Sequence, residues 1–581
     1  MKKIRTSRII IILSLLIVIG ISTGFLSTQE TRDFRIAKNL DIFFSLFREL
    51  NTFYVDEIDP DKIVKAGIDN MLRTLDPYTV YFPESEAEEF TILTTGKYGG
   101  IGSQVRSSGD YVVVSEVYKG FPADLAEIKA GDLLKKVDGV SLKGLSTEKV
   151  SEKLKGNPGT DINLTIERNG KEKEYQLKRE KITIPSVHYF GMIDSKTGYI
   201  RFTNFTQNCI DNVKNAVVSL KESNAQQIIL DLRGNPGGLL TEAVEIVNLF
   251  VGAGNEVVST KGKVKQFDED FKTTKPAIDE NIPLAVLINR SSASASEIVA
   301  GAIQDLDRGI IVGQRSYGKG LVQITRPLSY NTQLKVTTAK YYIPSGRCIQ
   351  ARDFSHPNED GSVGIIPDSL ISEFKTKNGR IVKDGGGITP DIEILPEPLS
   401  QVATELYIRN YIFDYATRYF WAHPEIKTPE QFSFTDQDYT DFKTFLLNRG
   451  FSYKTGTEES LNELIANAKK EKYYEMHKDL FTDLQKDIAH SLDQDLTAFR
   501  SEITDLLEDE IVSRYFYESG AIAYTIKKDE QLNKALEILN NKVEYSSILK
   551  GKAGSILVSG KNDPNIVRID YQDNRKNQEP V

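Results

Sequence analysis

The stretch LAVLINRSSASASEIVAGAIQDL, residues 284–306, contains the features that decide the fold of this chain. It begins with a short apolar run, Leu284 to Ile288, which predicts a buried strand. Small residues follow, and apolar residues then recur at helical spacing, at Ile298, Val299, Ala302, Ile303 and Leu306. Alternation of strands and helices along a chain indicates an α/β sheet with helices on its faces.

A serine lies at the turn between the predicted strand and the predicted helix. The hydroxyl of Ser294 would be exposed there, and the first turn of a helix leaves its backbone N–H groups without partners. N–H groups of this kind stabilise an oxyanion, so Ser294 is a candidate nucleophile and the amide of Ala295 a candidate oxyanion donor. Packing of small residues and a helix N-cap are the structural alternatives, and this segment alone would favour packing.

A serine nucleophile needs a base, and Lys319 is the candidate. None of the five histidines lies beside a Gly- or Ser-rich turn of the kind that positions catalytic groups. Lysine replaces histidine where burial lowers its pKa, and Gly318 and Gly320 would let Lys319 enter a tight site between two predicted strands. Gln323, four residues on, is a candidate for orienting the lysine.

The segment from Gly313 to Lys319 also fits most of the phosphate-binding pattern Gly-x-x-x-x-Gly-Lys. The next residue, however, is Gly320 rather than Ser or Thr, and a strand pattern follows in place of a helix. Both differences remove the mechanism of that motif, so the sequence does not favour a nucleotide-binding protein.

A second predicted strand ends in a Gly-rich turn, in the sequence QIILDLRGNPGGLL at residues 227–240. Glycines at such a turn bring backbone N–H groups close to a ligand, so Gly237 or Gly238 is a candidate for the second oxyanion donor. An ordinary connection between a strand and a helix is the structural alternative.

Together these motifs resemble the signatures of the carboxyl-terminal processing (tail-specific) peptidases, and they follow that family's order. The matching segments are DLRGNPGG at 231–238, SASASE at 292–297, GKGLVQ at 318–323, YIPSGR at 342–347 and GITPD at 387–391. The resemblance implies that Ser294 is the nucleophile, Lys319 the general base and Gln323 its support. It also implies an oxyanion hole made by the amides of Gly238 and Ala295, in a ClpP/crotonase-like α/β protease core.

The segment before the core resembles a PDZ domain. Its features are a Gly-rich loop at 98–102, an apolar strand at 111–114, and the pieces FPAD at 121–124 and KAGDLLKKVDG at 129–139. A helix capped by Ser146 would complete the peptide groove. Consecutive backbone N–H groups bind a terminal carboxylate, and an exposed strand edge pairs with the incoming tail.

Five residues of this PDZ-like segment are candidate site residues. The substrate-binding candidates are Gly99, Gly100, Ile101 and Gly102, in the loop that would hold the carboxylate. Arg168, which we place at the end of the last strand of this segment, is a candidate regulatory residue, because PDZ domains of the family often gate the active site. A solvated surface arginine is the simpler interpretation of Arg168.

Composition excludes several classes of function. The chain has 581 residues, enough for several domains, and its net charge of −9 comes from interspersed acids and bases, so we expect no nucleic-acid partner. Cys209 and Cys348 show no metal-ligand spacing, and we expect two free thiols, with a disulfide between them as the alternative. No motif indicates a metal ion or a cofactor.

The first residues predict export. Four basic residues within positions 1–8 precede an uncharged, mostly apolar stretch at 9–26, close to the minimum length for spanning a bilayer. We favour an uncleaved anchor over a cleaved signal peptide, because Ser22-Thr23-Gly24 is a poor match to an Ala-x-Ala cleavage site. Taken with the resemblance to tail-specific peptidases, this implies a bacterial envelope enzyme, a single-pass inner-membrane protein with its catalytic part outside the cytoplasm, either periplasmic or extracytoplasmic.

Helices are predicted on both sides of the core. Residues 32–75 contain two helical patterns, the second opened by Asp59-Pro60, and the apolar face of the first more often packs on its own chain than on a partner. In the family such helices can mediate dimerisation, so we also expect a homo-oligomer. Residues 399–420 are predicted to form one helix, and residues 458–538 several charged helices. Residues 551–581 form a polar end of the chain, and residues 353–384 are predicted to be a loop insertion.

The predicted organisation is multidomain α/β. It consists of a basic N-terminus (1–8), an anchor or signal sequence (9–26), N-terminal helices (32–90), a β-rich PDZ-like domain (91–180), a protease core (181–398) and a mainly helical region (399–581). The expected function is that of a serine endopeptidase whose protein substrates carry free, apolar C-termini. A catalytically silent or partner-activated peptide-binding scaffold is the alternative, and an adaptor or activator protein is a further expected partner.

Overall fold

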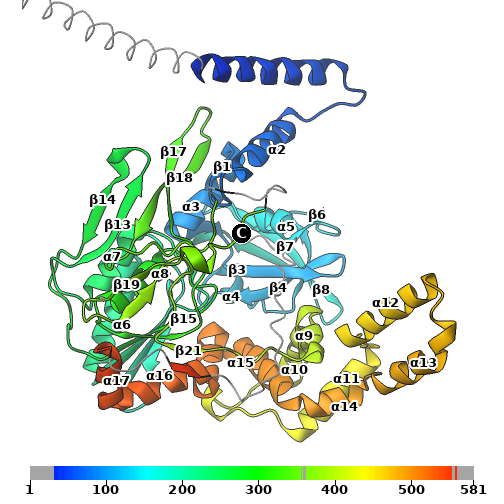
Figure 1. Ribbon diagram of the computed structural model, residues 1–581. Helices are drawn as coiled ribbons and strands as arrows, with labels where there is room; N and C mark the ends of the chain where they lie inside the picture. The colour runs from blue at the N-terminus through cyan, green and yellow to red at the C-terminus, as the bar shows by residue number, and fades with distance from the viewer. Residues whose placement is uncertain (1–31, 355, 357–361, 552–555, 559–581) are drawn as a thin grey trace, which may run out of the picture. The chain divides into compact units, whose positions relative to one another are not determined.

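The computed structural model describes residues 32–354, 356, 362–551 and 556–558, and its contacts divide the chain into two units, Met1–Pro83 and Glu84–Val581 (Figure 1). The first unit contains a helix over residues 32–53, helix α2 (Pro60–Arg73) and strand β1 (Val80–Phe82). Helix α2 begins as predicted: the side chain of Asp59 accepts the N–H groups of Asp61 and Lys62, and proline occupies the first helical position.

The apolar face of the helix over residues 32–53 is exposed. Its exposed large side chains are Phe34, Ile36, Leu40, Ile42, Phe43, Phe44, Leu46, Leu50 and Phe53. The expectation that this face packs on its own chain is therefore wrong for these side chains. Among the described residues no helix is both long and apolar enough to cross a bilayer, and the predicted anchor at 9–26 lies outside them.

The second unit begins with η1 (Glu84–Glu86), helix α3 (Ala87–Thr95) and the part that resembles a PDZ domain. Its sheet has the order β3-β4-β5-β7-β8, with β6 beside β5, and β2 pairs separately with β9. The strands are β2 (Lys97–Gly100), β3 (Ser103–Ser108), β4 (Tyr111–Val117), β5 (Leu133–Val137), β6 (Val140–Ser141), β7 (Asp161–Arg168), β8 (Lys171–Lys178) and β9 (Glu180–Thr183). Helices α4 (Pro122–Leu125) and α5 (Thr147–Leu154) complete it, and Ser146 caps α5 as predicted.

A seven-stranded sheet forms the predicted core, with the order β10-β11-β12-β15-β16-β21-β22. All neighbours run parallel except β10 and β11. The strands are β10 (Val187–Met192), β11 (Thr197–Phe202), β12 (Gln227–Asp231), β15 (Leu284–Ile288), β16 (Ile310–Gly313), β21 (Ile392–Ile394) and β22 (Ile556–Val558). Strand β22 comes from the segment predicted only as a polar end, and it pairs with β21.

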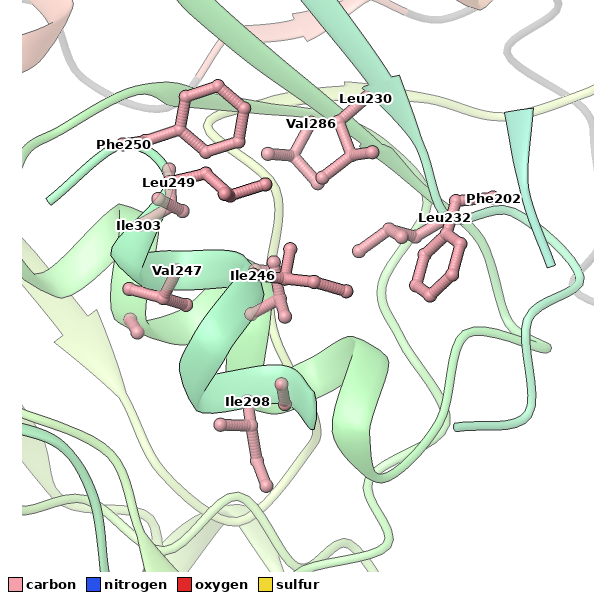
Figure 2. Close-up of a cluster of buried hydrophobic side chains, with 14 of the residues drawn as sticks. Phe202, Leu230, Leu232, Ile246, Val247, Leu249, Phe250, Val286, Ile298 and Ile303 are labelled. Carbon is pink, nitrogen blue, oxygen red and sulfur yellow. The ribbon is translucent and has the colours of Figure 1, made fainter. Parts of the chain in front are cut away.

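Helices cover both faces of this sheet because side chains alternate along each strand. Residues such as Leu230 and Val286 point to α6 (Cys209–Glu222), α7 (Leu240–Asn248) and α8 (Ala295–Asp305); Figure 2 shows this core with Ile246, Val247, Ile298 and Ile303. The intervening residues point to the opposite face, where α16 (Glu530–Asn540) and α17 (Lys542–Leu549) pack. The C-terminal region thus supplies one face of the core.

A smaller antiparallel sheet is formed by strands that alternate along the chain with those of the seven-stranded sheet. Strand β18 (Gln333–Tyr342) pairs with β17 (Leu321–Pro327) and β13 (Glu256–Gly262), and β13 pairs with β14 (Glu269–Lys272), with η2 (Lys265–Phe267) between them. The predicted loop insertion at 353–384 contains η3 (Asp368–Leu370) and a hairpin of β19 (Glu373–Lys375) and β20 (Ile381–Lys383). Cys209 and Cys348 are free thiols, as expected.

The remaining helices belong to the C-terminal region, in which α9, α10, α11, α14 and α15 share an apolar core. They are α9 (Gln401–Ile408), α10 (Tyr411–Ala422), α11 (Asp436–Asn448), α12 (Gly456–Lys470), α13 (Lys478–Asp487), α14 (Leu492–Ala498) and α15 (Arg500–Thr525), with short turns η4 (Pro429–Gln431), η5 (Glu475–His477) and η6 (Ile526–Lys528). The single helix predicted at 399–420 is wrong, because Asn410 adopts a left-handed conformation (φ 65°) and breaks it into α9 and α10.

Candidate active site

Ser294 is strained at the junction between β15 and α8. Its backbone has φ 55° and ψ −114°. Residues other than glycine rarely adopt such a positive φ. Helix α8 begins at the next residue, Ala295, and the N–H of Ile298 donates to the carbonyl of Ser294 at 3.0 Å. Strain of this kind is retained where the surrounding contacts hold it in place, and it is often found at functional sites.

Glu297 holds this strained turn. Its fully buried carboxylate accepts the Ser294 N–H at Oε2 (2.9 Å) and also the Lys319 N–H at Oε2 (3.0 Å). Oε1 accepts the Ser316 hydroxyl and the Gly318 N–H, each at 2.6 Å. One side chain therefore connects the serine turn to the Gly-Lys-Gly loop, which the sequence places far apart.

The surroundings of Glu297 act on its pKa in opposite directions. Burial raises the pKa of Glu297, and the hydrogen bonds from Ser316, Lys319, Gly318 and Ser294 offset part of that effect. Sequence reasoning missed this residue. The signal available was a glutamate three residues after a serine at a helix start, which is the capping-box pattern.

The glycines beside Lys319 are required by close contacts. Gly318 has φ 80° and Gly320 has φ 66°, and a Cβ on either would lie 2.4 Å from a side-chain carbon, that of Ala351 or Gln350. No residue with a side chain fits there without displacing the neighbouring segment. The loop between β16 and β17 thus carries Lys319 in a tightly packed backbone, as the flanking glycines predict.

The Gly-rich turn after β12 lies directly against the serine turn. A Cβ on Gly237 (φ 100°) would lie 2.6 Å from the Ala293 carbonyl oxygen and 2.7 Å from the Cβ of Ser294. The buried Asn235 joins the two turns, because its carbonyl accepts the Ala293 N–H at 3.0 Å and the Ser296 hydroxyl at 2.9 Å. Sequence reasoning did not single out Asn235.

The backbone N–H groups at this junction differ in whether they have a hydrogen-bond partner. The Gly237 N–H donates to Oδ1 of Asn235 at 2.9 Å. Within the described part of the chain, the N–H groups of Gly238 and Ala295 have no hydrogen-bond partner. These are the two donors that the resemblance assigns to an oxyanion hole.

Gln323 lies in β17 and contacts the neighbouring strand. Its Nε2 donates to the hydroxyl of Thr337 at 3.2 Å, opposite it in β18, just after an irregularity in the strand pairing. The support of Lys319 by Gln323 stays a prediction.

The charged residues of the motif at 231–238 point to the other face of the sheet. The fully buried Asp231 forms ion pairs with Arg233 at 2.6 Å and Arg201 at 2.9 Å. It also accepts a hydrogen bond from the Tyr199 hydroxyl at 2.7 Å. Arg233 forms a second ion pair, with Asp529, at 2.5 Å. Burial would raise the pKa of Asp231, but the two arginines outweigh burial and lower it to about 2. This network holds the start of α16 on the core.

The loop predicted to bind a carboxylate turns its carbonyls inward. The carbonyls of Gly99, Ile101 and Gly102 accept backbone N–H groups from Gly156, Ala123 and Tyr118 at 2.8 to 3.0 Å. In the described chain the N–H groups of Ile101 and Gly102 have no partner. A Cβ on Gly102 (φ 76°) would lie 2.5 Å from that of Phe121, so glycine is required.

Arg168 is not a solvated surface residue. Its guanidinium donates to both carboxylate oxygens of the fully buried Asp132, at 2.6 and 2.5 Å, and to the Glu127 carbonyl at 2.8 Å. Its other side faces the ring of Trp421 in α10, 5.1 Å from the ring centre. Its placement at the end of the last strand of the PDZ-like segment is also wrong, since β8 and β9 follow β7.

Comparisons with known proteins match three parts of the chain to known families. Residues 113–168 match the PDZ domain, residues 196–371 match peptidase family S41, and residues 402–539 match the C-terminal helical domain of probable PDZ-proteases. A probable CtpA-like serine protease of Staphylococcus aureus (strain COL) is 34% identical over 348 residues, which cover 59% of this chain and 67% of that protein. The chain belongs to the CtpA-like, carboxy-terminal-processing serine proteases.

A second relative in this family is the carboxy-terminal-processing protease of Bartonella bacilliformis, 35% identical over 342 residues, or 58% of this chain and 76% of that protein. Among solved structures, the photosystem II D1 C-terminal processing protease is 27% identical and covers 64% of this chain and 96% of its own, with a TM-score of 0.34. Membership confirms the resemblance seen in the motifs. The protein is a serine endopeptidase with a PDZ domain, and its substrates are proteins or peptides.

Proposed function

We propose that this carboxy-terminal-processing protease cleaves peptide bonds with a dyad of Ser294 and Lys319. The observation that carries the proposal is the carboxylate of Glu297, which accepts the backbone N–H groups of both residues at one oxygen. A buried acceptor shared in this way fixes the backbone of a nucleophile relative to that of its base, as an activated serine requires. Gln323 is proposed to support Lys319.

The reaction proceeds through an acyl-enzyme. Neutral Lys319 takes the proton of the Ser294 hydroxyl while the serine oxygen bonds to the substrate carbonyl carbon. The N–H groups of Gly238 and Ala295 stabilise the resulting oxyanion, since neither has another partner in the described chain. Protonated Lys319 then gives its proton to the leaving amine, the peptide C–N bond breaks, and water hydrolyses the ester after losing a proton to the same lysine.

We further propose that the PDZ domain selects substrates by a free C-terminal tail, with apolar terminal residues. The N–H groups of Ile101 and Gly102, which have no partner among the described residues, suit a terminal carboxylate, and Gly99 and Gly100 allow the loop to pack closely. Arg168, paired within the domain and facing Trp421 of the helical region, is proposed as a regulatory contact between the two parts.

The proposed location is the bacterial cell envelope. Residues 9–26 would anchor the chain in the inner membrane, with positions 1–8 in the cytoplasm and the catalytic part outside it. We assign 32–90 to N-terminal helices, 91–180 to tail recognition, 181–398 to catalysis and 399–581 to the helical region. The exposed apolar face at 32–53 supports a homo-oligomer, and an adaptor or activator is a further proposed partner.

The test is cleavage of an unfolded reporter with an apolar tail by the chain without residues 1–26. Wild type is compared with Ser294→Ala and Lys319→Ala, each with the reporter's terminal carboxylate free or amidated. We expect cleavage by wild type alone and loss of cleavage on amidation. Cleavage that survives Ser294→Ala would refute the serine assignment. A silent wild type that still binds the free-tailed reporter would favour the alternative, a partner-activated scaffold.

A further inference from the structure

The PDZ domain has one open strand edge beside its carboxylate loop. Strand β3 follows that loop directly and lies at the end of the sheet order β3-β4-β5-β7-β8. Helix α5 contacts β3, so the strand and the helix flank the groove in which an extended tail would pair. The terminal carboxylate would lie at Ile101 and Gly102, and the rest of the tail would run along β3 toward Ser108.

The register of β3 decides which backbone groups face the tail. Val105 lies opposite Val114, whose N–H donates to the Asp132 carbonyl and whose carbonyl accepts the Gly131 N–H, in the turn just before β5. Val105 therefore points its own N–H and carbonyl toward the open edge, and by alternation Ser107 does the same. A tail would pair with Val105 first and with Ser107 two residues farther from its end.

A side chain of the helical region already occupies the second of these positions. Nδ2 of Asn410 donates to the Ser107 carbonyl at 3.3 Å. Its Oδ1 is buried and has no hydrogen-bond partner within the described part of the chain. The amide thus satisfies an acceptor that an incoming strand would use.

Helix α10 holds Asn410 in this position. Asn410 is the left-handed residue that separates α9 from α10, and its carbonyl accepts the Asp414 N–H at 2.8 Å. Phe413, one turn into α10, lies 4.8 Å from the guanidinium of Arg106 in β3 and 4.4 Å from that of Arg514 in α15. The contact of Phe413 with Arg106 and the hydrogen bond from Asn410 to Ser107 therefore attach the start of α10 to the outer half of β3.

We propose that Asn410 determines how much of a substrate tail the PDZ domain reads. With the terminal residue opposite Ser103, the third residue from the end pairs with Val105, and the fifth would pair with Ser107 if Asn410 did not. The tail leaves the sheet before this point, because the amide of Asn410 already binds the Ser107 carbonyl. Asn410 is then a specificity-determining residue, and the inference rests on the proposed recognition of tails by β3.

The test uses the full chain in detergent with Ser294→Ala, so that bound peptide stays intact. Labelled nine-residue peptides with an apolar end carry one N-methylated amide, at the third or the fifth residue from the end, and their affinities are measured by fluorescence anisotropy. N-methylation removes one donated hydrogen bond, so a paired position loses affinity about five-fold. In wild type, N-methylation should lower the affinity only when it is at the third residue from the end.

Three variants complete the design. Asn410→Gly removes the amide and keeps the positive φ, and Asn410→Asp keeps the shape but cannot donate to Ser107. In both, N-methylation at the fifth residue should cost about five-fold in affinity, because the tail now pairs with Ser107. Asn208→Gly, another left-handed residue at a helix start (φ 63°), is the matched control and should behave as wild type.

The outcomes separate the two levels of the proposal. Sensitivity at the fifth residue in wild type, or insensitivity there in both Asn410 variants, overturns the role of Asn410 while tail recognition stands. Insensitivity at the third residue in every chain shows that the tail does not pair with β3, which overturns both.

Discussion

The backbone N–H groups of Ser294 and Lys319 donate to the same oxygen atom, Oε2 of Glu297, at 2.9 and 3.0 Å. The serine belongs to the start of α8 and the lysine to the loop before β17, so no regular secondary structure joins them. A fully buried side chain therefore fixes the distance between the backbones of the proposed nucleophile and base. This makes Glu297 a positioning residue for both.

Replacing Glu297 by glutamine should reduce kcat with little change in KM. An amide has one acceptor and one donor group, so its NH2 faces N–H or O–H donors whichever way it is turned. The displaced backbone should move Ser294 relative to Lys319, and a displacement of about 1 Å lowers activity roughly 100-fold. The measurement is kcat and KM on a tail-bearing reporter, together with the thermal midpoint of unfolding.

Glu242→Gln is the matched control for this prediction. Glu242, in the first turn of α7, accepts the N–H groups of Asn208 and Ile210 at the start of α6, at 2.9 and 3.1 Å, and none of these donors belongs to the serine turn. This variant should lose thermal stability and keep kcat. Equal losses of kcat in the two variants would show that Glu297 acts only through general stability.

The residues near Ser294 were predictable because their signals are local. An apolar strand, small residues and an apolar helical pattern fit together in one continuous segment, and glycines with positive φ flank Lys319 and form the turn at Gly237 and Gly238. Turns of this type leave a mark in the sequence because few residue types fit them. The position of Asn235 and Glu297 at the centre of the site could not be predicted from a local sequence pattern, since their hydrogen-bond partners come from distant segments.

Contacts between the PDZ domain and the helical region were also outside the reach of the sequence. Arg168 reads as an ordinary surface arginine until Asp132 and Trp421 are placed around it. Strand β22 is three residues long in a polar segment, and only its pairing with β21 identifies it. Such features depend on tertiary packing, which overrides local propensity.

Gly237→Ala should abolish activity while leaving the fold intact. The new Cβ would meet the Ala293 carbonyl oxygen, the Cβ of Ser294 and the Ala295 N at 2.6 to 2.8 Å, so the serine turn must move. We expect kcat to fall at least about 100-fold.

Gly254→Ala is the control, since Gly254 also has a positive φ (88°) but open space around it. It should cost roughly 1–2 kcal/mol of stability and no activity. Activity retained in Gly237→Ala would show that the serine turn tolerates displacement.

Arg168 and Trp421 should be energetically coupled. Arg168→Ala leaves Asp132 buried without its cation, and we expect a loss of about 3–5 kcal/mol in the free energy of unfolding of the PDZ domain. In a double-mutant cycle with Trp421→Ala, measured by urea unfolding, the coupling should be about 0.5–2 kcal/mol, the range for a guanidinium over an aromatic ring. A coupling near zero would mean that the helical region does not hold Arg168 in solution.

Acid should weaken the attachment of α16 to the core through Asp231. Its folded-state pKa of about 2 lies below the ordinary value of 3.8, because Arg233 and Arg201 outweigh its burial. A depressed pKa contributes stability that is fully present above the ordinary value and is lost as the pH falls toward the folded-state value. The difference in free energy of unfolding between wild type and Asp231→Asn should therefore narrow by about 2 kcal/mol from pH 5 to pH 2. Urea titrations across this range give the two curves, and parallel curves would show that the ion pairs of Asp231 are already lost in solution.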